Sequence, residues 1–314
     1  MSEFDLIQRY FTRPAPSATL GVGDDAALLR VGDDMELVVS SDMLVSGTHF
    51  LADTDPFRLG HKTLAVNLSD MAAMGAVPRW ATLALALPRA DADWLQRFSA
   101  GFFALADAHG VELVGGDTTR GPLTLCVTIM GEVPRGQALR RDGAKAGDDI
   151  WVSGVLGRAA LGLAHLKGES VLDEVLRDSC LAALQQPQPR VALGLALRGI
   201  AHSAIDISDG LLADLGHILE RSVLGAELNL ESIPIVQQGV AQPVAQRCAL
   251  TGGDDYELCF TAPASGRDAV AALAAHLALP LTRIGQIRAG HGCVLRDAAG
   301  KQMKIEKAGY DHFA

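Results

Sequence analysis

The residues of this sequence that could do chemistry are aspartates, which recur beside glycines or at the end of apolar runs. A single Gly–Asp pair is an ordinary turn, because both residues suit turn backbones. Three of the aspartates, Asp42, Asp117 and Asp206, each close an apolar run, which is where α/β proteins build their sites. The full set is Asp24, Asp25, Asp42, Asp70, Asp117, Asp206, Asp209, Asp254 and Asp255.

If these carboxylates converge in the fold, they need cations between them. Two unit charges about 4 Å apart repel by roughly 4 kcal/mol at an effective dielectric of 20. Carboxylate oxygens without a cluster of His or Cys select Mg²⁺, Mn²⁺ or Ca²⁺ over zinc. Because Mg²⁺ commonly joins one or two carboxylates to phosphate oxygens, the pattern suggests a polyphosphate held through several metal ions.

The stretch GVGDDAA at 21–27 resembles a dinucleotide-binding turn, with Gly21, Gly23 and Ala26 at the expected spacing. Two features oppose that interpretation. No convincing buried strand precedes the stretch, and Asp24 and Asp25 would repel a directly bound pyrophosphate. The P-loop pattern and the protein-kinase motifs are also absent from the sequence.

Asp70 differs from the other aspartates because it lies inside a helical pattern. Thr63, Asn67 and Asp70 are spaced i, i+4 and i+7, so they share one face of that helix. Two interpretations stay open for this polar stripe: it is the solvent side of the helix, or it points into a polar site.

Composition limits the class of protein. The chain has 314 residues, of which 49% are hydrophobic and 20% charged, as in globular proteins, and its formal net charge is -10. That charge argues against nucleic acid or an anionic membrane as the main partner. The five cysteines form no C-x-x-C pair, and the N-terminal residues carry two acids, unlike a signal peptide. We therefore expect a cytoplasmic protein.

Apolar runs alternate with helical patterns along the chain, which predicts a mixed α/β protein. The predicted strands are 36–42, 81–88, 124–133, 148–154, 257–262 and 282–287. The predicted helices are 55–75, 91–110, 157–168, 189–199, 209–222 and 266–278. A stretch rich in glycine and basic residues at 133–148 marks a boundary, so we expect an N-terminal α/β domain over 1–135 and a C-terminal α/β domain over 136–314.

Taken together and in order, the motifs resemble those of the thiamine-monophosphate kinases, in the superfamily of aminoimidazole ribonucleotide synthetase. The seven motifs are GVGDDAA, VVSSDMLVSGTHF, KTLAVNLSDMAAMGA, VGGDTTRGPL, AIDISDGLLADLGHI, GGDDYELCF and KAGYDHF. The resemblance implies a two-domain fold whose N-terminal sheet pairs with that of a second subunit in a homodimer. It also implies that ATP and thiamine monophosphate give ADP and thiamine diphosphate, with several Mg²⁺ ions and no covalent nucleophile.

The resemblance also assigns roles to single residues. Metal ligands are expected at Asp25, Ser40, Ser41, Asp42, Asp70, Asp117, Asp206 and Asp209. Contacts to ATP are expected from Gly116, Asp117, Arg141 and Ser208. Contacts to the substrate are expected from His49, Asp254 and Tyr310. The resemblance assigns no role to Asp24, and shaping of the turn is one open interpretation of that residue.

Three rivals remain open. Aminoimidazole ribonucleotide synthetase should lack the GTHF and GYDHF features, and selenophosphate synthetase should carry a reactive Cys near the N-terminus, whereas no Cys here precedes Cys126. A non-catalytic nucleotide-binding or metal-binding protein is the rival from another class. Release of ADP that depends on thiamine monophosphate and Mg²⁺ separates these alternatives.

Overall fold

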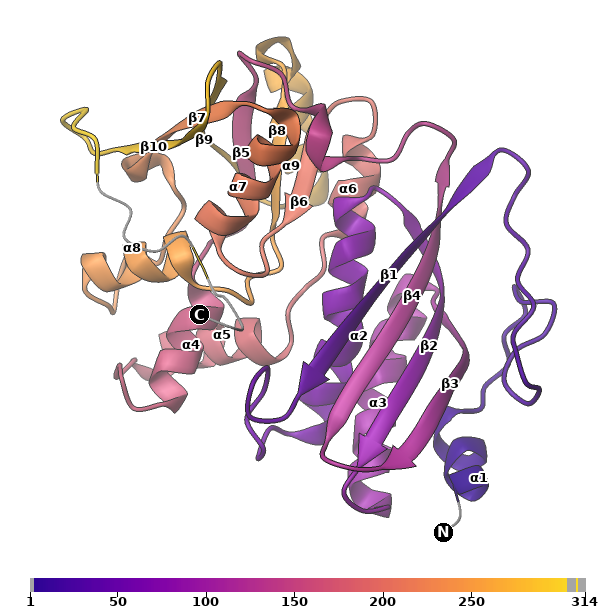
Figure 1. The fold of residues 1–314 in the computed structure, drawn as a ribbon. Coiled ribbons are helices and arrows are strands. Elements are labelled where there is room, and N and C mark those ends of the chain that lie inside the picture. Colours follow the sequence, from indigo (N-terminus) through magenta and orange to yellow (C-terminus); the bar gives the residue numbers. More distant parts are fainter. Residues whose placement is uncertain (1–2, 304–308, 310–314) are drawn as a thin grey trace. The chain divides into compact units, whose positions relative to one another are not determined.

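We analysed a computed structural model, which describes residues 3–303 and 309 (Figure 1). The chain divides into two compact units. The first comprises Met1–Met71 with Ala76–Gly136, and the second comprises Ala72–Gly75 with Gln137–Ala314.

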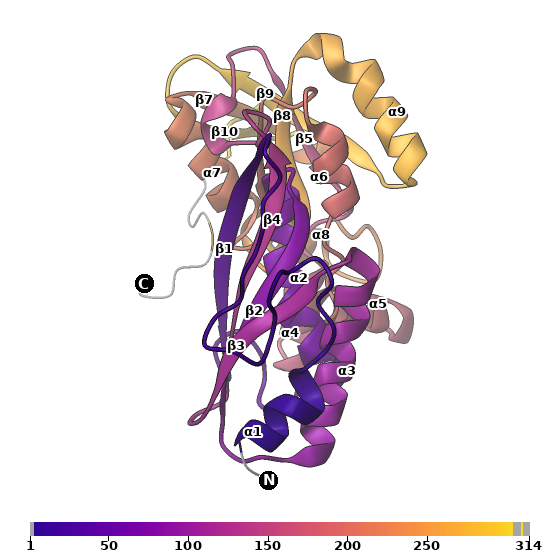
Figure 2. The ribbon, with the colours of Figure 1, turned by 90° about the vertical axis from the view of Figure 1, so that its right-hand side faces the viewer.

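The first unit is built on a four-stranded sheet in the order β1-β4-β2-β3. Its strands are β1 (Met35–Val45), β2 (Val77–Leu87), β3 (Glu112–Arg120) and β4 (Thr124–Pro134). β4 is antiparallel to both of its neighbours, whereas β2 and β3 are parallel. Two long helices, α2 (Pro56–Ala73) and α3 (Ala92–His109), cover one face of this sheet, and α1 (Glu3–Leu6) begins the chain beside them (Figure 2).

Close helix packing beneath this sheet depends on two glycines. A Cβ atom at Gly60 of α2 would lie 2.0 Å from the Phe98 carbonyl oxygen of α3, and one at Gly101 would lie 1.9 Å from the Phe57 oxygen. Those distances are far below van der Waals contact, so the two helices approach backbone to backbone only because both positions lack a side chain. Phe98 and Phe102 are fully buried in the same layer.

The second unit contains a six-stranded mixed sheet in the order β10-β7-β9-β5-β8-β6. Its strands are β5 (Asp149–Ser153), β6 (Ser203–Asp206), β7 (Gly225–Asn229), β8 (Leu258–Ala262), β9 (Leu281–Arg288) and β10 (Gly292–Arg296). Among the described strands of this sheet, only β10 and β7 pair in parallel. Its helices are α4 (Arg158–Leu166), α5 (Glu174–Gln185), α6 (Val191–Leu197), α7 (Leu211–Ser222), α8 (Gln242–Thr251) and α9 (Arg267–Leu277).

The core of the second unit lies between α7 and the sheet. Leu215 and Ile218 of α7 are fully buried in one apolar cluster with Ile150 of β5 and Leu228 of β7. This packing fixes the start of α7 close to the end of β6. The motif DISDG spans the end of β6 and the loop that leads to α7.

The structure confirms the mixed α/β class and corrects part of the predicted secondary structure. β3 was not predicted as a strand, and α5, α8, β6, β7 and β10 were also missed. Asp42 and Asp117 lie inside β1 and β3, so only Asp206 closes its strand as expected. Among the described residues, no helix has both the length and the hydropathy needed to cross a membrane.

Candidate active site

The polar stripe of α2 faces β1 and not solvent. The Ser40 hydroxyl donates to the Asp70 carboxylate at 2.5 Å, and the backbone N–H of Asp42 donates to Asn67 Oδ1 at 3.2 Å. Thr63 and Asn67 are each only 1% exposed. Of the two interpretations left open by the sequence, the solvent-side interpretation is therefore wrong, and Ser40 and Asp70 are brought together.

Strand alternation separates Ser41 from its two neighbours in the motif SSD. Its hydroxyl lies 3.0 Å from that of Thr128 on β4 and donates to the Val127 carbonyl at 3.1 Å. Because successive side chains of a strand point to opposite faces, the Ser41 side chain lies on the face away from Asp70. Its assignment as a metal ligand stays a prediction.

The loop GVGDDAA holds an internal contact at its centre. Asp24 Oδ1 accepts the backbone N–H of Asp25 at 2.9 Å, and both residues are exposed. Gly23 has φ +127°, a conformation that other residues rarely adopt. Asp24 thus shapes the turn, while Asp25 lies exposed in the same loop. Its role on a metal stays a prediction.

Gly116 and Asp117 occupy the middle of β3, beside β2. A Cβ atom at Gly116 would lie 2.0 Å from the Leu83 carbonyl oxygen, and its φ is +151°, so the position requires glycine. The next residue, Asp117, is exposed. The close approach of two strands therefore fixes where the Asp117 carboxylate emerges.

His49 lies in the turn that follows β1, with its Nδ1 atom accepting the backbone N–H of Val45 at 3.0 Å. That contact needs an unprotonated Nδ1, so the proton of the neutral ring resides on Nε2. The ring orientation is therefore set by the backbone of β1. The predicted substrate contact at Tyr310 falls outside the described residues.

In the second unit, the loop between β6 and α7 carries Asp206, Ser208 and Asp209. A residue that the sequence analysis did not single out, Asp214 of α7, organises it: its Oδ2 atom accepts the backbone N–H groups of Ser208, Asp209 and Gly210, each at 3.1 Å. Asp214 is 3% exposed. The signal that could have revealed it is an aspartate in the first turn of the helix after DISDG, where a carboxylate can reach the exposed amides.

A second loop, Gly252–Tyr256, is bonded to the first. The backbone N–H of Asp254 donates to the Ser208 carbonyl at 2.8 Å, and that of Tyr256 donates to the Ile207 carbonyl at 2.8 Å. Asp254 and Tyr256 have φ of 68° and 50°, in the left-handed region, and the Tyr256 hydroxyl donates to Asp254 Oδ1 at 3.1 Å. Such strained positions persist only where the surroundings hold them, and here they hold the predicted substrate residue Asp254.

Asp255 has a structural role in the same motif. Its carboxylate accepts the backbone N–H of Gly157, at the start of α4, at 2.7 Å. Burial, assisted by the nearby Glu257 charge, raises the pKa of Asp255 to about 8. The motif GGDDYE therefore contains two adjacent aspartates with different surroundings.

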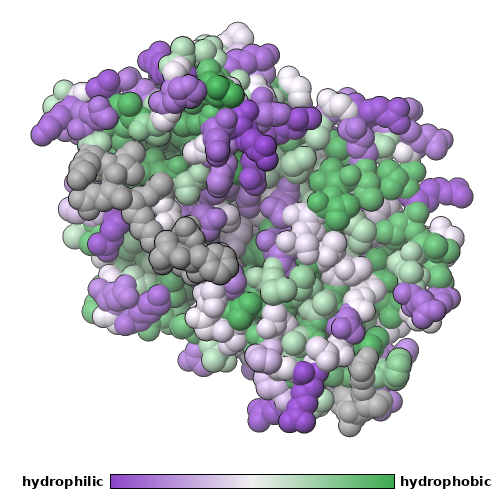
Figure 3. All heavy atoms as spheres, viewed as in Figure 1, coloured by the Kyte–Doolittle hydropathy of each residue, from purple (hydrophilic) through white to green (hydrophobic). Residues whose placement is uncertain are grey.

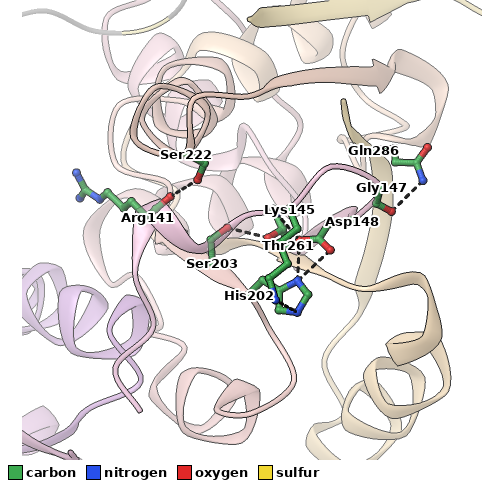
Figure 4. Close-up of polar contacts among 9 residues, drawn as sticks. All are labelled: Arg141, Lys145, Gly147, Asp148, His202, Ser203, Ser222, Thr261 and Gln286. Atoms are coloured by element: carbon green, nitrogen blue, oxygen red, sulfur yellow. Dashed lines mark hydrogen bonds and ion pairs between the residues drawn. The ribbon is translucent and has the colours of Figure 1, made fainter. Parts of the chain in front are cut away.

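Arg141 lies on a short 3-10 turn that is fastened to the second unit by its backbone (Figure 4). The Ser222 hydroxyl of α7 donates to the Arg141 carbonyl at 3.0 Å. Further along, His202 Nδ1 lies 2.9 Å from both carboxylate oxygens of the buried Asp148, and its Nε2 lies 3.3 Å from Lys145 Nζ. The Arg141 guanidinium points away from these contacts in Figure 4.

The donor chemistry of these loops fits hard cations. The predicted ligands are all carboxylate or hydroxyl oxygens, and they are divided between the two units. Burial, with the nearby charges of Asp206 and Asp209, raises the pKa of Asp214 to about 7. Within the part of the chain that the structure describes, no three His, Cys, Asp or Glu side chains form a ready-made metal site.

Comparison with known proteins places the chain in a family. Residues 23–133 match the AIR synthase related protein N-terminal domain, and residues 145–298 match the corresponding C-terminal domain. A thiamine-monophosphate kinase of Escherichia coli O157:H7 is 48% identical over 321 residues, covering 99% of this chain and 98% of its own. The chain belongs to the thiamine-monophosphate kinase family. The recognition made from the motifs is therefore confirmed.

Two solved structures extend the likeness to the family's fold. The thiamine-monophosphate kinase of Stenotrophomonas maltophilia K279a is 52% identical, with a TM-score of 0.85 and 96% coverage of each chain. A second structure, "AaThiL complexed with AMPPCP and TMP", is 30% identical, with a TM-score of 0.79, and covers 99% of this chain and 96% of its own. The two-domain architecture expected for the family is confirmed, whereas pairing of the sheet across a dimer is not tested.

Proposed function

We propose that the protein transfers the γ-phosphoryl group of ATP to thiamine monophosphate and releases ADP and thiamine diphosphate. The observation that carries this proposal is similarity along the whole chain, at 48% identity over 99% of its length, to a thiamine-monophosphate kinase. A relative 30% identical was solved in complex with AMPPCP and TMP, which supports the same pair of substrates here. The reaction is the last step in making thiamine diphosphate.

Several Mg²⁺ ions would supply charge neutralisation for the transfer. The residues that would hold them are the predicted oxygen ligands Asp25, Ser40, Ser41, Asp42, Asp70, Asp117, Asp206 and Asp209. When bound, such ions neutralise the phosphate charges that would otherwise keep donor and acceptor apart. The hydrogen bond between Ser40 and Asp70, and the one from the Asp209 N–H to Asp214, support this assignment.

The remaining site residues bind and orient the two substrates. Gly116, Arg141 and Ser208 contact ATP, in addition to Asp117. His49, Asp254 and Tyr310 contact thiamine monophosphate. Because the acceptor is a phosphate monoester whose second pKa is about 6, it is largely dianionic near neutral pH and needs no strong general base.

The transfer is direct and in line, so no side chain becomes phosphorylated. Incubation with radiolabelled ATP and Mg²⁺ but without thiamine monophosphate is expected to leave no acid-stable or base-stable label on the protein. Recovery of a labelled peptide would overturn the direct mechanism while leaving the substrates unchanged.

We also propose that the protein works in the cytoplasm as a homodimer, with the domains divided near residue 135. The open face of the first unit's sheet supports the dimer: Leu37, Val39 and Met43 of β1 are 46%, 55% and 55% exposed. Figure 3 shows a green, hydrophobic area over the upper part of β1 and β4, with paler residues below it. Apolar side chains on one face of a sheet favour a covering partner.

The deciding assay follows ADP release with each component omitted in turn. ADP is expected only when ATP, Mg²⁺ and thiamine monophosphate are all present, with thiamine diphosphate formed in equal amount. ADP release without thiamine monophosphate, or release with selenide in its place, would contradict the proposed function.

A further inference from the structure

The loop after β6 has no backbone N–H group left for a ligand over four consecutive residues. The N–H of Ile207 donates to the Glu257 carbonyl at 2.8 Å. Those of Ser208, Asp209 and Gly210 all donate to one oxygen, Asp214 Oδ2, at 3.1 Å. The carbonyls of Ile207 and Ser208 are used as well, by the backbone of Tyr256 and Asp254.

The amides of this loop bind a different partner from the one that such amides usually bind. Successive amides that precede a helix form a concave donor site, which in many proteins receives a phosphate. Here the donors converge on a carboxylate that belongs to the helix itself, because Asp214 lies in the first turn of α7. The place of the external anion is filled by the Asp214 carboxyl group, so the polar groups that the loop can offer a ligand are oxygen atoms.

We propose that Asp214 is a positioning residue that makes this loop bind cations and not phosphate directly. The inference rests on the proposed function. It deepens that function by explaining why the loop after β6 would contact the phosphates through metal ions. Asp214 holds the backbone of residues 208–210, which carries Ser208 and Asp209 and follows Asp206 closely in the chain. In this proposal Asp214 acts through the backbone, since it is buried and its Oδ2 atom is occupied by three amides.

The position of Ser208 also affects the neighbouring loop Gly252–Tyr256, which carries the predicted substrate residue Asp254. Ser208 accepts the backbone N–H of Asp254, and a Cβ atom at Gly253 would lie 2.4 Å from the Ser208 carbonyl oxygen. Any shift of Ser208 therefore displaces Asp254. Loss of Asp214 is expected to raise the KM for thiamine monophosphate as well as to weaken metal binding.

The test measures Mn²⁺ binding to the full chain in the absence of substrates, by the electron paramagnetic resonance signal of the free ion. Asp214→Ala is expected to weaken binding at least tenfold, as far as Asp209→Ala does, and Asp214→Asn to weaken it less. The matched control is Asp173→Ala, because Asp173 caps α5 of the same unit by accepting the Leu176 N–H at 3.0 Å. That variant is expected to bind Mn²⁺ within twofold of the wild type.

A purely structural role for Asp214 gives a different result. Both variants would then lower the unfolding midpoint while the folded protein kept its Mn²⁺ affinity. This outcome would overturn the inference. A wild-type protein that binds no Mn²⁺ would overturn it as well. If Asp214→Ala does not fold, Asp214→Asn decides the question by the same measurement. Mn²⁺ binding that depends on Asp214 in a protein that never phosphorylates thiamine monophosphate would reject the proposed function and keep the inference.

Discussion

At the scale of single residues, one short contact joins two motifs that are 30 residues apart in the chain. The Ser40 hydroxyl donates to the Asp70 carboxylate, and the buried Thr63 and Asn67 lie on the same face of α2. A carboxylate on a packed helix, oriented by a neighbouring hydroxyl, is held more rigidly than one on a loop. This rigidity is what a site that aligns two phosphates requires.

Replacing Asp70 by Asn should therefore damage turnover far more than folding. The amide keeps the shape and can still accept from Ser40, but it lacks the charge that a cation needs. We expect kcat to fall about 100-fold or more, as when one preorganised electrostatic group is removed. The unfolding midpoint should change by only a few degrees. Asp93→Asn, at an exposed position on α3, is the control and should retain full activity, whereas near-normal turnover in Asp70→Asn would show that Asp70 is not a ligand.

The buried carboxyl of Asp255 should make stability depend on pH. Burial raises its pKa from 3.8 to about 8, so between these values the folded state keeps a proton that the unfolded chain releases. The free energy of unfolding therefore decreases as pH rises from about 4 to about 8. Asp255→Asn removes this dependence, because the amide does not titrate.

Urea denaturation at pH 5 and pH 9 tests this expectation. The wild type should lose more stability between the two pH values than Asp255→Asn does, by at least about 1 kcal/mol, since one unit of pKa corresponds to 1.4 kcal/mol. Parallel losses in both proteins would show that Asp255 titrates normally in the folded state.

At the scale of elements, glycines decide how closely neighbouring helices and strands approach. Gly60 and Gly101 let α2 and α3 meet backbone to backbone, and Gly116 does the same for β2 and β3. The helix pair places Asp70 under β1, and the strand pair places Asp117 at the surface of β3. Close packing in these layers is thus a condition for the position of two predicted ligands.

Two helical glycines should respond in opposite ways to alanine. At Gly101 the added Cβ would lie 1.9 Å from the Phe57 carbonyl oxygen, so α2 and α3 must separate, and we expect Gly101→Ala to cost about 2 kcal/mol or more. At Gly216 of α7 nothing lies within 4 Å, so Gly216→Ala should stabilise by about 0.5–1 kcal/mol through helix propensity. Free energies of unfolding from urea titration measure both, and a neutral Gly101→Ala would contradict the tight helix crossing.

At the scale of the whole molecule, charge and hydropathy are unevenly distributed. The chain carries a net charge of -10, yet Leu37, Val39 and Met43 leave an apolar strip on β1. β1 is also an edge strand of its sheet, and natural edge strands are normally protected by charge or by a covering partner. This combination fits a surface that a second copy of the chain covers.

A charge placed on this strip should separate the subunits. We expect Val39→Lys to convert a dimer to a monomer at micromolar concentration in sedimentation velocity, because an unpaired charge would have to be buried in the interface. Val171→Lys, at a position of the second unit that is 89% exposed, should remain dimeric. A wild-type protein that sediments as a monomer would reject the dimer at the outset.

Much of the fold was predictable wherever the local pattern was strong. The periodicity of residues 91–110 predicts α3 within one residue at each end, and the apolar run at 124–133 predicts β4 nearly in full. β3 was missed because GGDTTR contains neither alternation nor bulky residues, and it becomes a strand only by pairing with β2. α5 and α8 were also missed, and their packing in the second unit stabilises them, since Cys180 of α5 and Cys248 of α8 share one apolar cluster.

The sequence by itself determined the chemistry: oxygen ligands in glycine-rich surroundings, an acidic chain, and seven ordered motifs that identify the family. Only the tertiary structure decided that the polar stripe of α2 faces β1, that Ser40 and not Ser41 lies on the face that meets Asp70, and that Asp214 holds the loop of Asp206 and Asp209. The physical reason is that residue types and local periods are properties of a short segment. Which partner a side chain reaches across a sheet, or which amides a carboxylate occupies, depends on the packing of segments far apart in the chain.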